Sequence, residues 1–402
     1  MVENNELQTP FYRVKEKDLL FDIALLKRAL EENWGNYAMG YSVKTNSLPW
    51  LLSYLRTKGF YAEVVSEMEY DLAVRLGYSD NRIIYNSPIK KKEIWEKILL
   101  NGGYINLDSS QELDWLEELS QKYPTKRFHI GIRVNCDLKS ICPKEELAEG
   151  EGGRFGYCYE NGVLEQVIKR VSEKGNIKIS GLHLHSSTKS RTVQVYGSLA
   201  KMAVKIAKEF RLDLEFVDMG GGYFGGRDDM PNYLDYFKVI GGELRKFFSS
   251  EKTKLIVEPG VSLISRAITF ETSVLDIKDI RGCKYIVTDG SRINLNPLVT
   301  RHYYPHHFQL CQKEKRKNEK SQWVCGNTCM EYDRLFEIKD GVELKVGDRI
   351  IYDTAGGYTM CLTPLFIYYF PRVWIEKENG QLFLAREEWS NEEYLQKYYW
   401  EK

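Results

Sequence analysis

The chain has 402 residues, of which 43% are hydrophobic and 28% charged, a balance typical of a globular protein with room for two domains. Its 57 Lys and Arg residues match its 57 Asp and Glu residues, and this zero net charge argues against nucleic acid or an anionic membrane as a partner. The N-terminus has no apolar signal segment, no window approaches a membrane span and the eight cysteines are scattered, so we expect a reducing, cytoplasmic setting with free thiols.

Short apolar runs alternate with amphipathic segments through the first two-thirds of the chain. The runs are rich in Ile, Val, Leu, Phe and Tyr, which is typical of strands buried on both faces. Eight such runs occur: residues 37–44, 60–66, 82–87, 104–109, 128–135, 179–185, 214–222 and 254–260. The segments between them carry helix start signals, namely Ser66 with Glu69, Ser87 with Pro88, and Ser109 with Glu112.

Eight strand-then-helix units predict a (β/α)8 barrel, with a doubly wound open sheet as the alternative. We place this barrel at residues 22–262. From about Val261 the pattern changes to short strand-like runs without long helices between them. We therefore expect a second, C-terminal β domain of sandwich or barrel type, formed by residues 263–402 together with residues 1–21.

Polar residues and glycines stand where the predicted strands end. They are Lys44, Glu63, Ser87, Ser109, Arg133, Asn135, His183, His185, the glycines at 220–222, and Glu258. Each alone has a structural interpretation, such as a solvated lysine, a core histidine or a plain glycine turn. In a (β/α)8 barrel, however, the strand C-termini meet at one mouth, so we expect these residues to converge there.

A lysine, a glutamate and a glycine-rich turn at one mouth suit pyridoxal 5′-phosphate. This cofactor needs an amine for its aldehyde, a partner for its ring nitrogen and backbone N–H groups for its phosphate. Lys44 offers the amine, and Glu258 can hold a proton on the ring nitrogen. Gly220 to Gly222 let the backbone approach a phosphate closely.

On these residues the chain resembles the fold-type III pyridoxal-phosphate decarboxylases, the family of diaminopimelate and ornithine decarboxylases. The resemblance covers nearly the whole chain and follows the family order of motifs. These include "YSVKTN", "YNSPIKKKEI", "IRVN", "RFGY", "GLHLHSST", "VDMGGGYFGG", "VEPG", "CGNTCMEYDRL" and "DTAGGYTM".

The resemblance implies a role for each matching residue. Lys44 is the lysine that bonds to the cofactor aldehyde, His185 stacks on the cofactor ring, and Glu258 binds the pyridine nitrogen. The residues implied at the phosphate are Thr188, Gly220, Gly221, Gly222 and Tyr358. Cys329 protonates the substrate Cα and comes from the partner subunit in this family. This implies a homodimer with shared active sites, in which the β domain supplies Cys329 and Tyr358.

Four positions depart from the family pattern. Val261 stands where the family has the arginine of "EPGR", and Ser187 replaces a glycine beside Thr188. Met330 replaces an acidic residue that binds a distal amine in ornithine decarboxylases, and Asn296 stands where diaminopimelate enzymes carry an arginine for the distal carboxylate.

These departures weaken both standard substrates. A distal ammonium buried without its carboxylate partner is costly. We therefore expect a non-standard or conjugated amino acid of siderophore-type or natural-product biosynthesis, with Met330, Asn296, Arg301 and Asp333 near the substrate. A diaminopimelate or diamine-forming basic amino acid decarboxylase is the alternative.

Three further interpretations stay open. An amino-acid racemase shares the barrel and cofactor, although racemases of the alanine-racemase type place an arginine at the ring nitrogen, where this chain offers Glu258. A catalytically inactive regulatory homologue is the second. A zinc site at Cys325 and Cys329 is the third, but its further ligands are unconstrained by the sequence, and we expect no metal.

Overall fold

A computed structural model describes residues 7–145, 153–186, 188–298, 300–312 and 315–401. The chain divides into two units, which we call the barrel unit (Ile23–Ser262) and the β unit (Met1–Asp22 with Leu263–Lys402). Among the described residues, no helix is both long enough and apolar enough to cross a bilayer.

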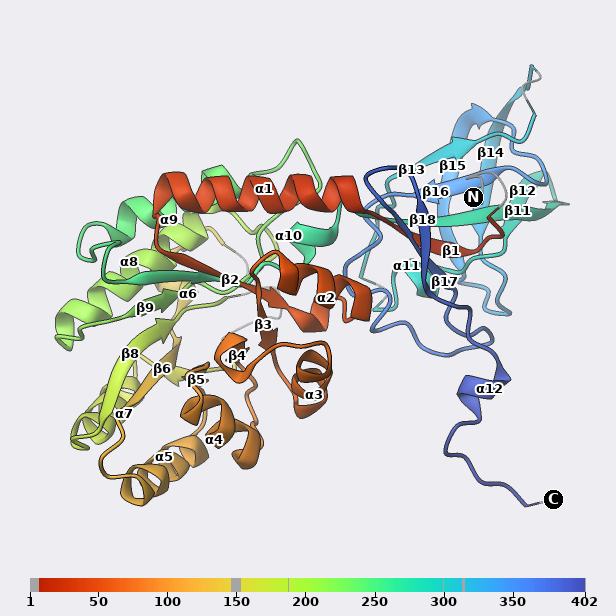
Figure 1. The fold of residues 1–402 in the computed structure, drawn as a ribbon. Helices are drawn as coiled ribbons and strands as arrows, with labels where there is room; N and C mark the ends of the chain where they lie inside the picture. Colours follow the sequence, from red (N-terminus) through yellow and green to blue (C-terminus); the bar gives the residue numbers. More distant parts are fainter. Residues whose placement is uncertain (1–6, 146–152, 187, 299, 313–314, 402) are drawn as a thin grey trace. The chain divides into compact units, whose positions relative to one another are not determined.

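The barrel unit is a closed ring of eight parallel strands (Figure 1). The pairing of β5 with β6 closes the ring, and the two-residue strand β7 (Tyr157–Cys158) adds to β6 outside it. The ring strands are β2 (Tyr37–Ser42), β3 (Tyr61–Val64), β4 (Ile83–Tyr85), β5 (Tyr104–Leu107), β6 (Phe128–Asn135), β8 (Ile177–His183), β9 (Phe216–Asp218) and β10 (Lys254–Val257). The predicted (β/α)8 barrel is confirmed, and the open sheet was the wrong alternative.

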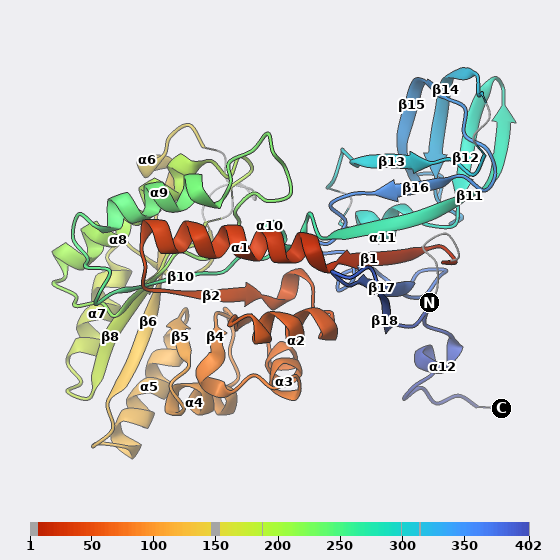
Figure 2. The same cartoon turned by 45° about the horizontal axis from the view of Figure 1, so that its top comes forward.

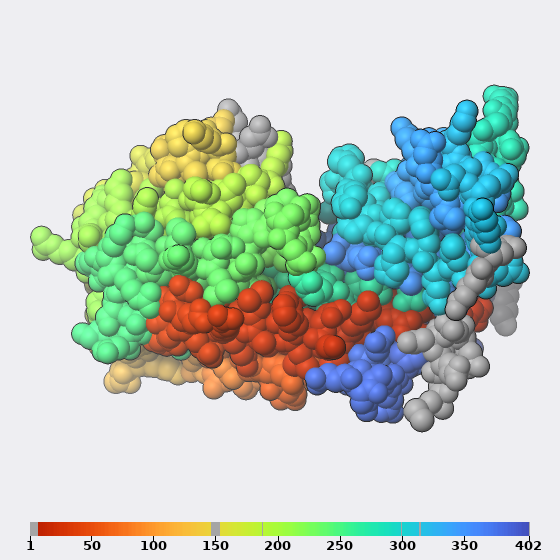
Figure 3. Space-filling view, turned by 90° about the horizontal axis from the view of Figure 1, so that it is seen from above, coloured from red at the N-terminus to blue at the C-terminus, as the bar shows by residue number. Residues whose placement is uncertain are grey.

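Helices surround the ring, as expected for parallel strands joined by crossovers. They are α1 (Glu16–Asn33), α2 (Pro49–Thr57), α3 (Glu67–Arg75), α4 (Lys92–Leu100), α5 (Ser110–Lys122), α7 (Val163–Ser172), α8 (Val193–Glu209) and α9 (Tyr233–Leu244), with the short elements η2 (Val43–Thr45), η3 (Asp80–Arg82), α6 (Leu138–Ile141) and α10 (Val261–Ile264). Figure 3 shows the green surface of α9 beside the red surface of α1. A Cβ added to Gly241 of α9 would lie 2.3 Å from the backbone oxygen of Asn33, so the missing side chain permits this close helix contact.

Two of the three predicted helix starts are confirmed. Ser66 caps α3 through the backbone N–H of Glu69, and Ser109 with Glu112 forms a complete capping box at α5. The third prediction, that Ser87 and Pro88 open α4, is wrong because α4 begins at Lys92.

The Lys90 side chain explains the later start of α4. Its amine is buried and forms an ion pair with Glu112, with Nζ and Oε1 2.8 Å apart. The same amine donates to the carbonyls of Ser87 and Asn106. A buried charge needs such partners, and an extended segment before α4 brings them together.

The lower layer of the barrel interior is apolar. Ala38, Ile84, Phe216 and Ile256 form a buried cluster. Phe216 fits because Gly181, on the neighbouring strand β8, has no side chain. A Cβ at position 181 would lie 2.1 Å from the Phe216 ring. This layer is the floor on which the candidate site lies.

The β unit contains a mixed sheet in which β1 is central (Figure 2). β1 pairs antiparallel with β11 and parallel with β17, and Arg13 on β1 joins both neighbours. Its guanidinium lies 2.6 Å from Glu271 and 3.0 Å from Glu376. The elements are β1 (Phe11–Lys15), β11 (Ile268–Ile280), β12 (Cys283–Thr288), α11 (Arg292–Leu295), β13 (His306–Gln309), β14 (Asn318–Cys325), β15 (Arg334–Val342), β16 (Arg349–Tyr352), β17 (Arg372–Glu376), β18 (Leu382–Arg386) and α12 (Asn391–Tyr394).

The contact between Gly181 and Phe216 predicts a cost for one methyl group. We expect Gly181→Ala to lower the free energy of unfolding by about 1–3 kcal/mol in urea denaturation, because the barrel interior has no space for the added carbon. Gly175→Ala is the matched control, since a Cβ there meets no atom within 4 Å. Phe216→Leu added to Gly181→Ala should recover part of the loss. Equal stability of the two alanine variants would contradict this packing argument.

Candidate active site

The strand alternation places polar side chains directly above the apolar floor. Phe216 and Asp218 are two residues apart on β9, and Ile256 and Glu258 are two residues apart at the end of β10. Side chains two apart on a strand share a face. The floor residues Phe216 and Ile256 therefore carry Asp218 and Glu258 above them, at the C-terminal mouth of the barrel, where active sites of this fold lie.

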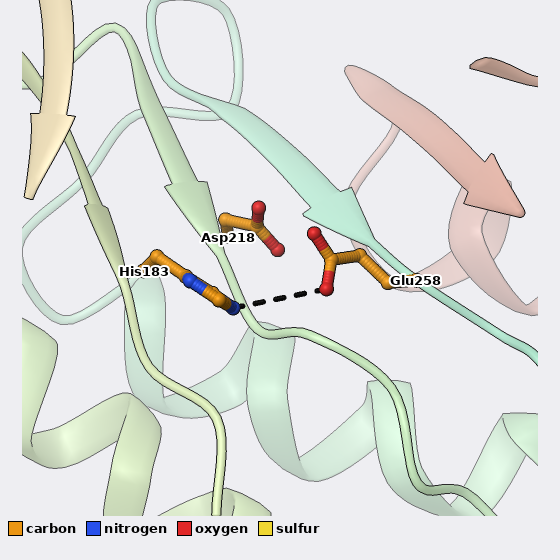
Figure 4. Close-up of side chains that lie close together, drawn as sticks. All are labelled: His183, Asp218 and Glu258. Carbon is orange, nitrogen blue, oxygen red and sulfur yellow. Dashed lines mark ion pairs between the residues drawn. The ribbon is translucent and has the colours of Figure 1, made fainter. Parts of the chain in front are cut away.

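Asp218 and Glu258 form a pair of buried carboxyl groups, which we call the carboxyl pair. Asp218 is 0% exposed and Glu258 is 5% exposed, and Figure 4 shows the two groups facing each other. Burial raises the pKa of both, and the negative charge of Asp218 raises that of Glu258 further. The pKa is raised for both groups, and more strongly for Glu258, so the pair favours keeping one proton.

Amide groups hold the carboxyl pair in place. The Asn86 side-chain amide donates to Oε1 of Glu258. Asn106 donates to the Asn86 oxygen at 2.8 Å and to Oδ2 of Asp218 at 3.1 Å. The backbone N–H of Gly220 donates to Oδ1 of Asp218 at 2.9 Å. These bonds fix both carboxyl groups and offset part of the cost of burying them.

Two neutral histidines lie next to the carboxyl pair. Nε2 of His183 is 3.7 Å from Oε2 of Glu258, yet neither ring nitrogen of His183 has a hydrogen-bond partner among the described residues. Burial, and then the charge of Arg133, lowers the pKa of His183 well below its usual value and that of His185 to about 3. The two rings are parallel, with centroids 6.4 Å apart. Both histidines therefore present uncharged rings beside the carboxyl pair.

Lys44 lies in the short turn η2, directly after β2. Its side chain is 43% exposed, and Nζ is 2.9 Å from Oε2 of Glu63, which is 1% exposed. The Ser42 hydroxyl donates to the same Glu63 oxygen at 2.6 Å. Close by, burial raises the pKa of Glu69 to about 7. Buried Glu63 therefore holds a lysine amine at the rim of the barrel.

The glycine turn at 220–222 is required by close packing. Gly220 and Gly222 have φ of +61° and +87°, in the left-handed region. A Cβ on Gly220 would lie 2.7 Å from His185, and one on Gly221 would lie 2.1 Å from the backbone oxygen of Glu258. The backbone of this turn therefore lies directly against His185 and Glu258.

The loop after β8 supplies Thr188, which is buried. Its hydroxyl oxygen accepts a hydrogen bond from the Arg191 backbone N–H at 3.0 Å. Ser187, which stands where the family has a glycine, lies outside the described residues. Val261 begins α10 and follows Glu258 closely in the chain.

In the β unit, Asn296 uses its side chain to shape its own loop. Its oxygen accepts from the backbone N–H groups of Thr300 and Arg301, and its amide donates to the Arg301 carbonyl and the Tyr304 hydroxyl. Arg301 in turn donates to the carbonyl and hydroxyl of Thr354. We expected both residues near the substrate. Asn296 has its partners within the loop, whereas the Arg301 side chain has its partner in Thr354.

Asp333 anchors the segment that carries Cys329 and Met330. It is 3% exposed, and its carboxylate accepts from the hydroxyls of Ser291 and Thr328 and from the backbone N–H of Arg292. The Cys329 thiol is free and exposed. Asp333 thus fixes the backbone at Thr328, directly before the exposed Cys329.

Tyr358, also in the β unit, has φ of +58° and is 37% exposed.

Of the predicted site residues, the barrel unit contains Lys44, His185, Thr188, Gly220–Gly222 and Glu258. The remaining predicted site residues belong to the β unit: Asn296, Arg301, Cys329, Met330, Asp333 and Tyr358.

Sequence reasoning missed the groups that support Glu258, namely Asp218, Asn86 and Asn106. One available signal was their position, since each lies within one residue of a strand C-terminus. Asp218 also stands two residues before the glycine turn, on the same strand face as Phe216.

One group of possible metal ligands occurs among the described residues. His183, Asp218 and Glu258 offer atoms within 4.8 Å of one another, and a divalent cation accepts such a donor set. The proposed zinc ligands Cys325 and Cys329 are not in a group of this kind within the described part of the chain.

Comparison with known proteins adds sequence relatives. A family profile described as "Pyridoxal-dependent decarboxylase, pyridoxal binding domain" matches residues 22–265. The chain is 25% identical over 399 residues to a probable chloroplastic diaminopimelate decarboxylase of Oryza sativa subsp. japonica, covering 96% of this chain and 79% of the relative. It is 27% identical to diaminopimelate decarboxylase of Aquifex aeolicus (86% and 82% covered) and 26% identical to ornithine decarboxylase of Mus musculus (81% and 72% covered).

Solved structures share the fold. Diaminopimelate decarboxylase from M. jannaschii has a TM-score of 0.83 at 24% identity, covering 98% of this chain and 92% of that one. Lysine decarboxylase from Selenomonas ruminantium has a TM-score of 0.71 at 20% identity, with 94% of each chain covered. A barrel followed by a β domain is thus the architecture of known decarboxylases.

The carboxyl pair predicts a pH dependence of stability. Its raised pKa values mean that the folded protein retains a proton which the unfolded chain loses above about pH 4. The pair therefore lowers the free energy of unfolding as the pH rises from about 4 through about 6. We expect Asp218→Asn to reduce this slope in urea titrations of the ligand-free protein, by one to a few kcal/mol across the range, at about 1.4 kcal/mol per pKa unit. Asp213→Asn, at a side chain that is 89% exposed, should leave the slope unchanged. An unaltered slope in Asp218→Asn would contradict the shared proton.

Proposed function

Because this chain belongs to the pyridoxal-dependent decarboxylase family and is a carboxy-lyase that uses pyridoxal 5′-phosphate, we propose that its substrate is diaminopimelate or a diamine-forming basic amino acid. The observation that carries this proposal is the family match across the whole barrel unit, combined with a proton-bearing Glu258 at the barrel mouth. The relatives named above are diaminopimelate and ornithine decarboxylases.

The residues at the mouth fit the cofactor. The glycine turn has no Cβ atoms and lies against His185 and Glu258, and Nδ1 of His185 has no hydrogen-bond partner among the described residues. Bound pyridoxal 5′-phosphate supplies an electron-withdrawing ring that stabilises negative charge at the substrate Cα as CO2 leaves. We assign Lys44 to the aldehyde, His185 to the ring face, and the glycine turn with Thr188 and Tyr358 to the phosphate.

Glu258 has the main electrostatic role in this proposal. Burial and the charge of Asp218 disfavour the ionised form of its carboxyl group, so we propose that this group holds a proton when the cofactor binds. That proton is available to the ring nitrogen of the cofactor and keeps the ring electron-poor. An arginine at this place would not share a proton in this way, so Glu258 favours decarboxylation over racemisation.

Glu63 positions the lysine. Its buried carboxylate holds the Lys44 amine at 2.9 Å, so the amine stays at the rim when it is not bonded to a ligand. We also propose that Cys329 delivers the proton to the substrate Cα and that a homodimer brings it to the barrel unit of the partner. The exposure of its free thiol supports this role.

The substrate proposal replaces the conjugated amino acid that we expected from the sequence, because the relatives act on diaminopimelate and ornithine according to their names. Asn296 was one reason for that expectation, and its hydrogen bonds give it a structural role instead. Met330 stands where the family has an acidic residue, and the next residue is Glu331, whose side chain is 96% exposed. We propose Glu331 as the carboxylate for a distal ammonium.

A substrate panel tests the proposal. CO2 release should occur with one of meso-diaminopimelate, L-ornithine, L-lysine or L-arginine, and Lys44→Ala should reduce it to background. Treatment with EDTA should leave the rate unchanged, because we assign Glu258 to the ring nitrogen of the cofactor, with Asp218 as its partner, and not to a metal. Release only from conjugated amino acids, or enantiomer exchange without CO2, would overturn the substrate or the reaction, respectively.

Cys329→Ala separates cofactor binding from protonation. We expect cofactor affinity to stay within twofold, because the thiol has no assigned role in binding, while amine formation falls by about 10- to 10⁴-fold or the product changes. Visible absorbance titration and product analysis measure the two effects. Cys283→Ala, in β12, is the control. Full rate and an unchanged product in Cys329→Ala would refute this assignment.

A further inference from the structure

Arg191 has an unusual place at the barrel mouth. It lies between Thr188 and the first residue of α8, and its φ is +47°. An L-residue with a side chain seldom adopts this left-handed conformation unless surrounding contacts hold it there.

Hydrogen bonds fix the Arg191 backbone against the segment that follows the glycine turn. Its N–H donates to the Thr188 hydroxyl at 3.0 Å, and its carbonyl accepts from the Tyr236 hydroxyl at 2.6 Å. The Tyr236 hydroxyl also accepts from the backbone N–H of Phe224 at 3.4 Å. The Arg191 guanidinium lies 5.5 Å from the centre of the Phe224 ring, so it stands close to the chain just beyond Gly222.

The first turn of α8 lies against the same glycine turn. Tyr196, in that first turn, donates from its hydroxyl to the Gly221 carbonyl at 3.0 Å. This 17-residue helix has no side-chain cap at Thr192 and no acidic residue in its first turn. The positive end of a helix dipole favours anions and disfavours a neighbouring cation. Arg191 at this end therefore carries a small energetic cost, and an anion bound there would offset that cost.

The other cations near His185 already have carboxylate partners. Lys44 is paired with Glu63, and Arg133 with Asp108 at 3.3 Å. Among the described residues, Arg191 makes no ion pair with a carboxylate; its guanidinium contacts the Phe224 ring. Arg191 is therefore the guanidinium that remains for an anionic ligand at the glycine turn.

We propose that Arg191 binds the phosphate group of the cofactor, together with the Thr188 hydroxyl and the backbone of Gly220–Gly222. This rests on the proposed function, since it assigns a further residue to the same cofactor. Val261 leaves the segment after Glu258 without a cation, and Arg191 supplies that charge from another loop.

Comparison of pyridoxal 5′-phosphate with pyridoxal, which lacks the phosphate, tests the proposal. In the full chain freed of cofactor, we expect Arg191→Gln to weaken pyridoxal 5′-phosphate binding by about tenfold to a hundredfold, as loss of a charge-assisted contact does. Pyridoxal affinity should stay within twofold. Arg211→Gln is the matched control, because Arg211 has φ of +52° just beyond the other end of α8 and is exposed.

Arg191→Gly removes the backbone strain as well as the charge, so it separates binding from folding. It should lose the same phosphate-dependent affinity without a loss of thermal stability. Equal weakening of both ligands, or unchanged binding in Arg191→Gln, would overturn the role of Arg191 alone. A wild-type chain that binds neither ligand would overturn the proposed function, and this role with it.

Discussion

The cost of burying Asp218 and Glu258 side by side governs the site. Two carboxyl groups out of water cannot both ionise cheaply, and one proton shared between them lowers that cost. The shared proton in turn requires donors that fix the orientation of both groups, which Asn86, Asn106 and the Gly220 N–H provide. A proton-bearing glutamate at a barrel mouth is then available for a ring nitrogen.

Close backbone packing is the second consequence of this arrangement. The glycine turn lies so near Glu258 and His185 that a side chain at Gly220 or Gly221 would collide with them. The same turn accepts a hydrogen bond from Tyr196 in the first turn of α8. The turn therefore joins the carboxyl pair to the helix end where we place the phosphate. In the proposed complex, this single backbone segment would contact both Glu258 and the cofactor phosphate.

The β unit shows how predicted binding residues can instead be structural. Asn296 bonds to residues of its own loop, whereas Asp333 joins its loop to Ser291 and Arg292. Their role is to hold Arg301 and the Cys329 segment in place. In the function that we propose, substrate selection would depend on exposed side chains of these loops, such as Glu331, whose charge suits a basic substrate.

The sequence alone indicated the eight strands, because strands buried on both faces are rich in Ile, Val, Leu, Phe and Tyr, as are the runs from 37–44 to 254–260. It also indicated Lys44 and Glu258, whose residue types and strand-end positions are local properties of the chain. Only the tertiary structure revealed the partners of these residues. Residues distant in sequence form the Asp218–Glu258 pair and the Lys90–Glu112 ion pair. The neutral state of His183 likewise depends on burial and on neighbouring charges, which no local sequence pattern contains. The start of α4 differed for the same reason, since a distant buried charge outweighed a local capping signal.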